Sequence, residues 1–146
     1  MTGVAVARRG ERGSAAIEAA IGVPAFVLFV GLIIFGGRTA TTHQAVESAA
    51  ADAARSASIT RNSTDAQQAA EQAAHDTLAN QHLDCLAVTV NVDTSGFAAP
   101  VGQPASVAVT VTCRLDLSDL SVPGVPGTRL ISATMTSPID TFRERA

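Results

Sequence analysis

The sequence predicts an α+β fold, in which a long N-terminal transmembrane helix extends outward, a second short helix follows, and a small antiparallel β-sheet of about three strands completes the chain. Three observations predict this class. Residues 19–37 form an uncharged apolar run. Alanine-rich segments that favour helix follow as far as about residue 80. Beyond residue 84, apolar side chains recur at every second position, as they do in half-buried strands.

The composition argues against two classes of protein. Hydrophobic residues make up 47% of the 146 residues and charged residues 16%, whereas ordinary soluble domains are about 25% charged. This low charge, together with a mean hydropathy of +0.25, argues against a disordered chain. The net charge of -3 and the lack of a basic patch argue against a nucleic-acid-binding protein.

The apolar run is long enough to cross a membrane. It reads AAIGVPAFVLFVGLIIFGG and lies between Glu18 and Arg38. As a helix rising about 1.5 Å per residue it spans roughly 28 Å, which is close to the thickness of the hydrocarbon core of a bilayer. The alternative is the buried core helix of a soluble protein. So small a domain, however, has too little further mass to cover the segment on all sides.

The charges that flank the run predict its orientation. Arg8, Arg9 and Arg12 precede it, whereas Arg38 alone follows it closely. The positive-inside rule then gives a single-pass protein of the cytoplasmic membrane, with its N-terminus inside and its C-terminal domain outside. Two other interpretations stay open. One is a secretory signal peptide cut after the run, near the small residues 39–41, and the other is a plain uncleaved anchor.

The anchor helix is expected to continue beyond the membrane. Residues 38–58 are alanine-rich and contain neither Gly nor Pro, so one helix is predicted from about residue 14 to the end of this segment. A break is expected at 59–62. Asp52 and Arg55 are predicted to form an ion pair at i,i+3 spacing. Small apolar residues share one stripe of the extension and predict a closely packed face: Val46, Ala50, Ala53 and Ala57.

A second helix is predicted from the capping signals near residue 64 to an end between residues 80 and 83. Thr64 is a suitable N-cap, and Gln67 completes a capping box with it. The apolar stripe of this helix is again made of small residues: Ala66, Ala69, Ala70, Ala73, Ala74 and Leu78.

Three alternating segments predict the sheet. In the first, at 86–92, Leu86 and the following valines share one face. The segment 107–115 is its natural antiparallel partner, because the loop 93–103 between them is rich in turn residues. A third, weaker strand is predicted at 130–137, after a loop of Pro and Gly.

Cys85 and Cys113 lie at strand ends that meet in such a hairpin. The exported side of a membrane is oxidising, so a disulfide is expected. In the chain-entropy model, closing a loop of about 28 residues stabilises the fold by roughly 3–4 kcal/mol. The alternation raises a conflict, because Cys113 lies on the valine face and Cys85 has the opposite parity to Leu86. A bulge, or a position of Cys85 before the strand, would remove it.

No catalytic constellation is predicted. The sequence contains no Gly-rich phosphate loop, no H-E-x-x-H pattern and no G-x-S-x-G pattern. His75 and His82 are seven residues apart and could share a helix face, but no third ligand is spaced to join them in a metal site. We therefore expect no enzymatic activity, no metal, no cofactor and no small-molecule substrate.

The segment before the apolar run, RGSAAIEAA, resembles the processing signal of type IV prepilins. In that family the peptidase cuts on the cytoplasmic side after a Gly, and the fifth residue of the mature chain is typically Glu. The resemblance places the cut between Gly13 and Ser14 and makes Glu18 the fifth mature residue. The new amine of Ser14 can then pair with Glu18 of a neighbouring subunit. The alternative is that Glu18 is an interfacial residue favoured by the helix dipole.

The whole layout resembles the TadE-like family of pseudopilins, from the tight-adherence branch of the type IV pilus systems. The basic leader, the apolar run with Pro24, the alanine-rich helix and the cysteine-bearing strand pair carry the resemblance, which is best over the first 60 residues. It implies a pilin-like organisation: a basic cytoplasmic leader at 1–13, a membrane-spanning and extended helix at 14–60, and an exported α+β head at 61–146.

The resemblance also implies a minor pilin-like subunit that helps to assemble a tight-adherence pilus or a related secretion fibre. The implied partners are membrane lipid, the prepilin peptidase, other pilin-like subunits and the pilus assembly machinery. The alternative is an uncleaved, membrane-anchored extracytoplasmic binding domain that never enters a fibre. The alanine excess and the use of Arg in place of Lys suggest a high-GC bacterium.

Overall fold

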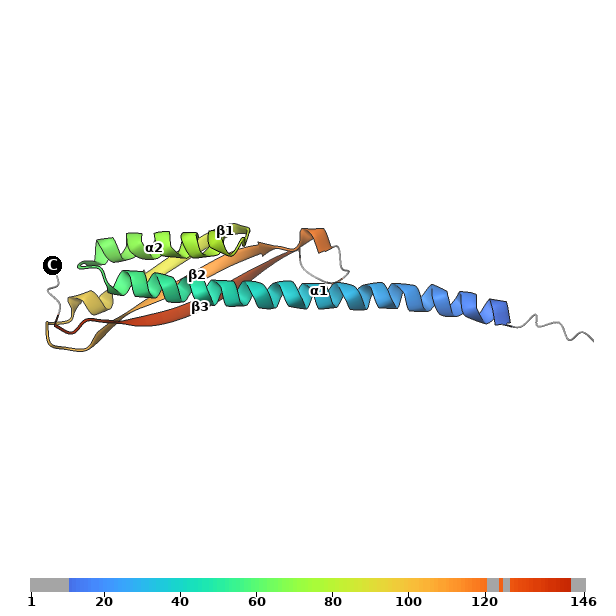
Figure 1. Cartoon of the computed structure of the whole chain (residues 1–146), viewed down its shortest axis with the longest axis horizontal. Coiled ribbons are helices and arrows are strands. Elements are labelled where there is room, and N and C mark those ends of the chain that lie inside the picture. The colour runs from blue at the N-terminus through green and yellow to red at the C-terminus, as the bar shows by residue number, and fades with distance from the viewer. Residues whose placement is uncertain (1–10, 121–123, 125–126, 143–146) are drawn as a thin grey trace, which may run out of the picture.

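The computed structural model describes residues 11–120, 124 and 127–142. Within them the chain has the predicted α+β architecture, and Figure 1 shows an elongated molecule from which one end of the first helix projects far beyond the rest. The helices are α1 (Glu11–Ser58) and α2 (Ser63–Asn80), and the strands are β1 (Cys85–Asp93), β2 (Ala105–Asp116) and β3 (Thr128–Ile139). Short 3-10 helices follow β1 and β2: η1 (Ser95–Ala98) and η2 (Ser118–Leu120).

Helix α1 is continuous over 48 residues and runs through Pro24 without interruption. It begins three residues before the predicted start and ends at Ser58, where the prediction placed its end. Two hydroxyl groups bond back onto the last turn, since Ser58 donates to the carbonyl of Arg55 and Thr60 donates to the carbonyl of Ala57, both at 2.8 Å. These bonds satisfy carbonyls that the end of a helix leaves without partners.

The cap of α2 differs from the prediction. Asn62, not Thr64, is the N-cap, and its side-chain oxygen accepts a hydrogen bond from the backbone N–H of Asp65 at 2.8 Å. The side-chain amide of Asn62 also donates to the Asp65 carboxylate at 2.9 Å. The N-cap therefore lies two residues earlier than predicted, because Asn caps a helix at least as well as Thr. The predicted capping box of Thr64 and Gln67 is wrong.

The ion pair predicted between Asp52 and Arg55 is also wrong. The Asp52 carboxylate instead accepts a hydrogen bond from the Thr77 hydroxyl of α2 at 2.9 Å. An exposed i,i+3 pair contributes only about 0.2–0.5 kcal/mol, so a neutral donor on the adjacent helix competes with it successfully. This bond links α2 to α1.

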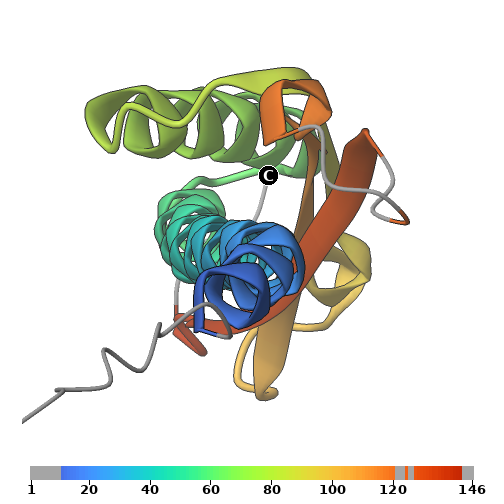
Figure 2. The same cartoon turned by 90° about the vertical axis from the view of Figure 1, so that its right-hand side faces the viewer.

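The core lies between the two helices and one face of the sheet, as the end-on view in Figure 2 shows. The central strand β2 supplies wholly buried side chains at alternate positions, and small buried residues of α1 pack against it. The buried small residues of α2 pack against α1, and α2 also contacts β1. Both predicted helix stripes are confirmed, although Ala69 and Ala73 are only half-buried. The residues that meet here are Val46, Ala50, Ala53, Ala57, Ala66, Ala70, Ala74, Val107, Val109 and Val111.

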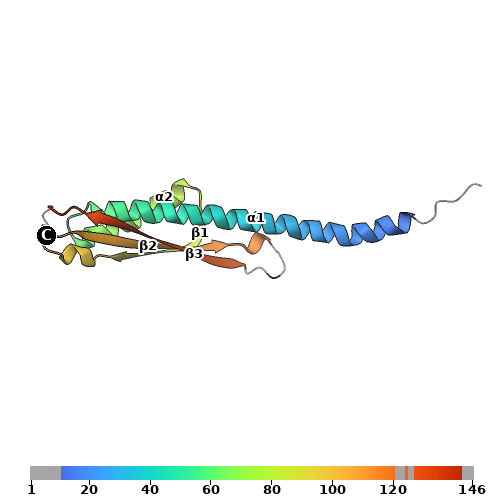
Figure 3. The same cartoon turned by 90° about the horizontal axis from the view of Figure 1, so that it is seen from below.

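The sheet is a meander with strand order β1-β2-β3, and it runs beside the distal half of α1 (Figure 3). Strand β3 is longer than the weak strand that was predicted. It has 12 residues and pairs with β2 along its whole length. On the outer face, cross-strand hydroxyl pairs support this register: Thr110 with Thr134 at 2.8 Å and Thr112 with Ser132 at 3.0 Å.

Candidate functional site

The N-terminal half of α1 is an exposed apolar rod. By length and composition it can cross a membrane, and none of its most apolar stretch is buried within the structure. Phe26 is 66% exposed and Phe29 59% exposed, where the core helix of a soluble protein would be covered. The structure thus argues against the soluble alternative, and lipid is the environment in which such a surface is stable.

The residues of the prepilin-like signal lie at the far end of this rod. The backbone of Gly13 and Ser14 belongs to the first turn of α1, and Glu18 follows about one turn later. The Glu18 side chain is exposed, and no described basic side chain pairs with it. Residues 1–10 of the predicted leader lie outside the described part of the chain.

Two contacts join α1 to the head where the apolar run ends. Arg38 donates from Nη1 to both carboxylate oxygens of Asp119 in η2, at 2.7 Å and 3.0 Å. The guanidinium carbon of Arg129, near the start of β3, lies 6.0 Å from the centre of the Phe35 ring, within range of a cation–π interaction. Neither contact was predicted, because Arg38 and Asp119 are 81 residues apart and carry no local signal of their pairing.

The turn that carries Asp119 is itself held by a carboxylate. The Asp116 side chain accepts a hydrogen bond from the backbone N–H of Ser118 at 2.9 Å, and this bond lowers the pKa of Asp116. The backbone N–H of Ser95 lowers the pKa of Asp93 in the same way, at the other end of the sheet. Both carboxylates therefore stabilise turns in their ionised form.

A disulfide joins Cys85 and Cys113, with their Cα atoms 5.5 Å apart. The register of β1 against β2 shifts between Cys85 and Ala87, so Leu86 is the extra residue of a β-bulge. The bulge turns Cys85 toward the valine face of the sheet, so that both cysteines lie on the same face, although simple alternation placed them on opposite faces. The expectation that Leu86 shares the buried face is therefore wrong, and its side chain is 57% exposed.

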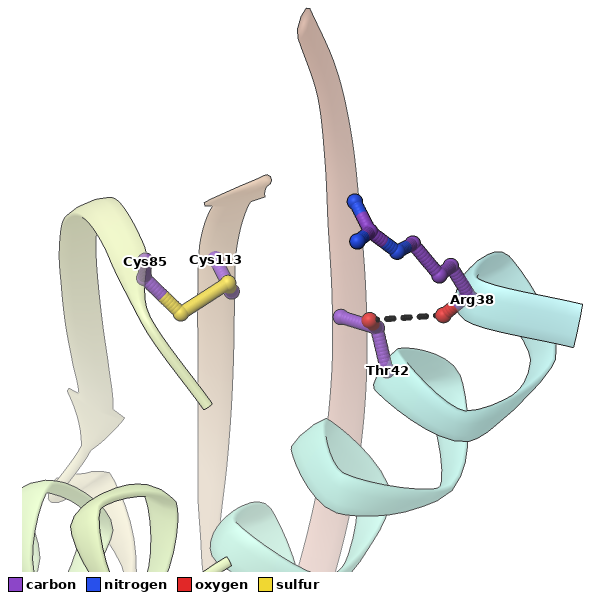
Figure 4. The surroundings of a disulfide bond; sticks show 4 residues. All are labelled: Arg38, Thr42, Cys85 and Cys113. Atoms are coloured by element: carbon purple, nitrogen blue, oxygen red, sulfur yellow. Dashed lines mark hydrogen bonds between the residues drawn. A yellow bond between two sulfur atoms is a disulfide. The ribbon is translucent and has the colours of Figure 1, made fainter. Parts of the chain in front are cut away.

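The disulfide braces the end of the head that lies nearest the apolar rod. Figure 4 shows it on the sheet at the level of Arg38 and Thr42 of α1. The Thr42 hydroxyl donates to the Arg38 carbonyl at 2.8 Å, and the Thr42 side chain is buried against the sheet. Three interactions therefore stabilise this end of the head: the Arg38–Asp119 ion pair, the packing of the buried Thr42 side chain, and the disulfide.

The histidines do not form a metal site in the part of the chain that the structure describes. Helix α2 ends at Asn80, so His82 lies in the turn beyond it and does not share a helix face with His75. The ring of His82 contacts the carbonyl of Ala79 at 3.3 Å. Among the described residues, no group of three or more His, Cys, Asp or Glu side chains is placed to hold a metal ion.

Comparison with protein-family models gives a match to one family, described as TadE-like protein, over residues 13–55. The matched segment begins at Gly13, contains Glu18 and the whole apolar run, and ends within the half of α1 that packs against the head. Comparisons with curated proteins and with solved structures give no match.

Proposed function

The chain is a TadE-like protein, from a pilus-associated structural family, and on this premise we propose that it is a minor pilin-like subunit that helps to assemble a tight-adherence pilus or a related secretion fibre. Its apolar helix anchors it in a membrane in a single pass. The observation that most supports the proposal is the exposed rod of α1, which carries the carboxylate of Glu18 just before an uncharged run at 19–37. Such a rod is suited to packing beside the same helix of other subunits.

In this proposal the prepilin peptidase cuts between Gly13 and Ser14, and the leader 1–13 stays in the cytoplasm. The mature chain then consists of the helix at 14–60 and the exported head at 61–146. The excess of Arg before the span supports this orientation. The protein is structural rather than enzymatic, and its partners are the peptidase, other pilin-like subunits and the assembly machinery.

Glu18 has a physical reason to seek a partner in an assembly. A carboxylate at the edge of a membrane segment costs up to a few kcal/mol if it moves into hydrocarbon without one. Cleavage at Gly13 creates an amine on Ser14 that carries a positive charge at neutral pH. When a subunit leaves the interface and enters a bundle, the amine of one subunit and Glu18 of its neighbour can neutralise each other in a medium of low dielectric.

Replacement of Glu18 tests this role. We expect Glu18→Gln to insert into the membrane normally and to enter fibres at least about tenfold less well, because removing one partner of a buried ion pair costs about 3–5 kcal/mol. The measurement is the fraction of protein in sheared fibres relative to the membrane fraction. Glu71→Gln is the matched control, since Glu71 is exposed on α2 in the head. Equal incorporation of the two variants would contradict the role of Glu18.

The intact mass of the protein from its host tests processing separately. Loss of residues 1–13 is the expected result. An intact N-terminus would instead favour a plain membrane-anchored binding domain, and loss of about 40 residues would favour a secreted domain cut by signal peptidase.

A further inference from the structure

The contacts between α1 and the base of the head determine how close the head lies to the bilayer. Phe35 lies two residues before the end of the apolar run, which is about 3 Å along a helix. Its ring packs against the core of the head, and the guanidinium of Arg129 lies over it at 6.0 Å. Since Phe35 belongs to the span, the start of β3 lies at the level of the lipid headgroups.

The ion pair between Arg38 and Asp119 places a second segment at the same level. Arg38 is the first residue after the apolar run, and its 2.7 Å contact with Asp119 brings η2 beside the end of the span. The pair also compensates the charge of Asp119. The head therefore rests on the membrane through two connections and is not held away from it on a stalk.

We propose that this base of the head, which we call the membrane rim and define as Arg38, Asp119, Arg129 and Leu130, is a lipid-binding surface. Arg129 binds a phospholipid phosphate, and the Leu130 side chain enters the boundary between headgroups and acyl chains. The proposal goes beyond the role of the protein in a fibre. It requires only that residues 19–37 cross the membrane.

The chemistry of Arg129 and Leu130 fits this partner. Arg129 is exposed, and no carboxylate that the structure describes forms an ion pair with it. A guanidinium group on a long apolar stem binds phosphate in a bidentate manner while its stem stays among apolar groups. Leu130, the next residue, is 63% exposed on the outer face of β3. An exposed Leu beside an Arg at this depth matches the boundary between apolar chains and charged headgroups.

Lipid is favoured over a protein partner because the rim is continuous with the span. The contacts of Phe35 and Arg38 hold the rim against the membrane segment in every copy of the chain, whether or not a second protein is present. The opposite end of the head has exposed apolar residues as well, such as Val101 at 60% exposure. That end lies where α1 finishes (Figure 1), and none of the described contacts joins it to residues 19–37, so it provides a control.

A single tryptophan can report the depth of each position, because the natural chain contains no Trp and no Tyr. The full chain is reconstituted in phosphatidylcholine vesicles, with or without lipids that carry bromine in the upper acyl chain. Leu130→Trp is expected to show blue-shifted emission and strong quenching by the bromolipid. Val101→Trp is expected to emit as in water and to remain unquenched. Phe26→Trp, within the span, is expected to be quenched by lipids brominated deeper in the chain.

The role of Arg129 is tested in the Leu130→Trp chain. Addition of Arg129→Gln is expected to shift the emission to longer wavelength and to weaken quenching, whereas the control Arg61→Gln, in the distal turn after α1, leaves both unchanged. If Leu130→Trp behaves like Val101→Trp while Phe26→Trp is quenched, the rim does not touch lipid and the proposal is wrong. If Phe26→Trp is also unquenched, residues 19–37 do not cross the membrane, and the proposal is wrong as well. Equal effects of the two Arg variants would overturn the phosphate contact.

Discussion

Asn62 uses both ends of its side-chain amide to begin α2. The oxygen accepts from the backbone of Asp65 and the nitrogen donates to the Asp65 carboxylate, so two polar groups are satisfied by one residue. This contact fixes the start of α2 just after the turn that follows α1.

Asn62→Ala is expected to lower the free energy of unfolding by about 1 kcal/mol, the usual cost of losing an N-cap. Thermal unfolding of the full chain in detergent, followed by circular dichroism, measures the effect. Gln68→Ala is the control, because Gln68 is exposed in the body of α2 and Ala favours helix at that position. If the two variants unfold at the same temperature, the cap does not stabilise the protein.

The sheet depends on how β1 is aligned with β2. The bulge at Leu86 turns Cys85 toward the core face, and the disulfide then closes the hairpin at its membrane-proximal end. The periodicity of the sequence predicted both strands and the conflict between the cysteines. It could not choose between a bulge and an early Cys85, because that choice depends on the pairing with β2 and not on β1 alone.

Joint replacement of Cys85 and Cys113 by Ser is expected to lower the free energy of unfolding by about 2–4 kcal/mol, because the open hairpin gains conformational entropy when it unfolds. Denaturant unfolding of the oxidised protein and of the double variant measures the difference. The natural chain under reducing conditions is the control and should unfold like the double variant. Equal stability of all three samples would show that the disulfide contributes nothing to the fold.

The long-range contacts of α1 with the head could not be predicted from the sequence. The extent of α1 and the buried stripes of both helices follow from composition and from spacing at three and four residues. The pairing of Arg38 with Asp119 and the contact of Arg129 with Phe35 do not follow, because they form only when β2 and β3 lie beside α1. The sequence alone predicts that Arg38 flanks the apolar run, but it does not predict that Arg38 pairs with Asp119.

Helix α1 has two environments. Its first half is exposed and apolar, and its second half supplies part of the core of the head, including Val46 and Ala50. The head is thus incomplete without the end of the helix that anchors it. Removal of all of α1 would expose the valine face of β2 to water, and a small domain without Tyr or Trp has little other core to compensate.

A fragment of residues 38–146 is therefore expected to fold as a soluble protein, whereas a fragment of residues 61–146 is expected to lack stable structure. Circular dichroism and size-exclusion chromatography of the oxidised fragments distinguish the two results. The shorter fragment keeps α2, the sheet and both cysteines, so it is the matched control for the contribution of α1. Cooperative unfolding of the shorter fragment would contradict the view that α1 completes the core.

Because α1 is one continuous helix, it also fixes how its N-terminal end is rotated about the helix axis relative to the head. Each helical residue turns the chain by about 100° and advances it by about 1.5 Å. Because α1 has no break between Glu18 and Arg38, every copy points Glu18 in the same direction relative to its own head. Insertion of one residue between them would rotate the carboxylate about 100° around the helix axis. The continuous helix therefore fixes both the distance of Glu18 from the head and the direction in which Glu18 points around the helix axis.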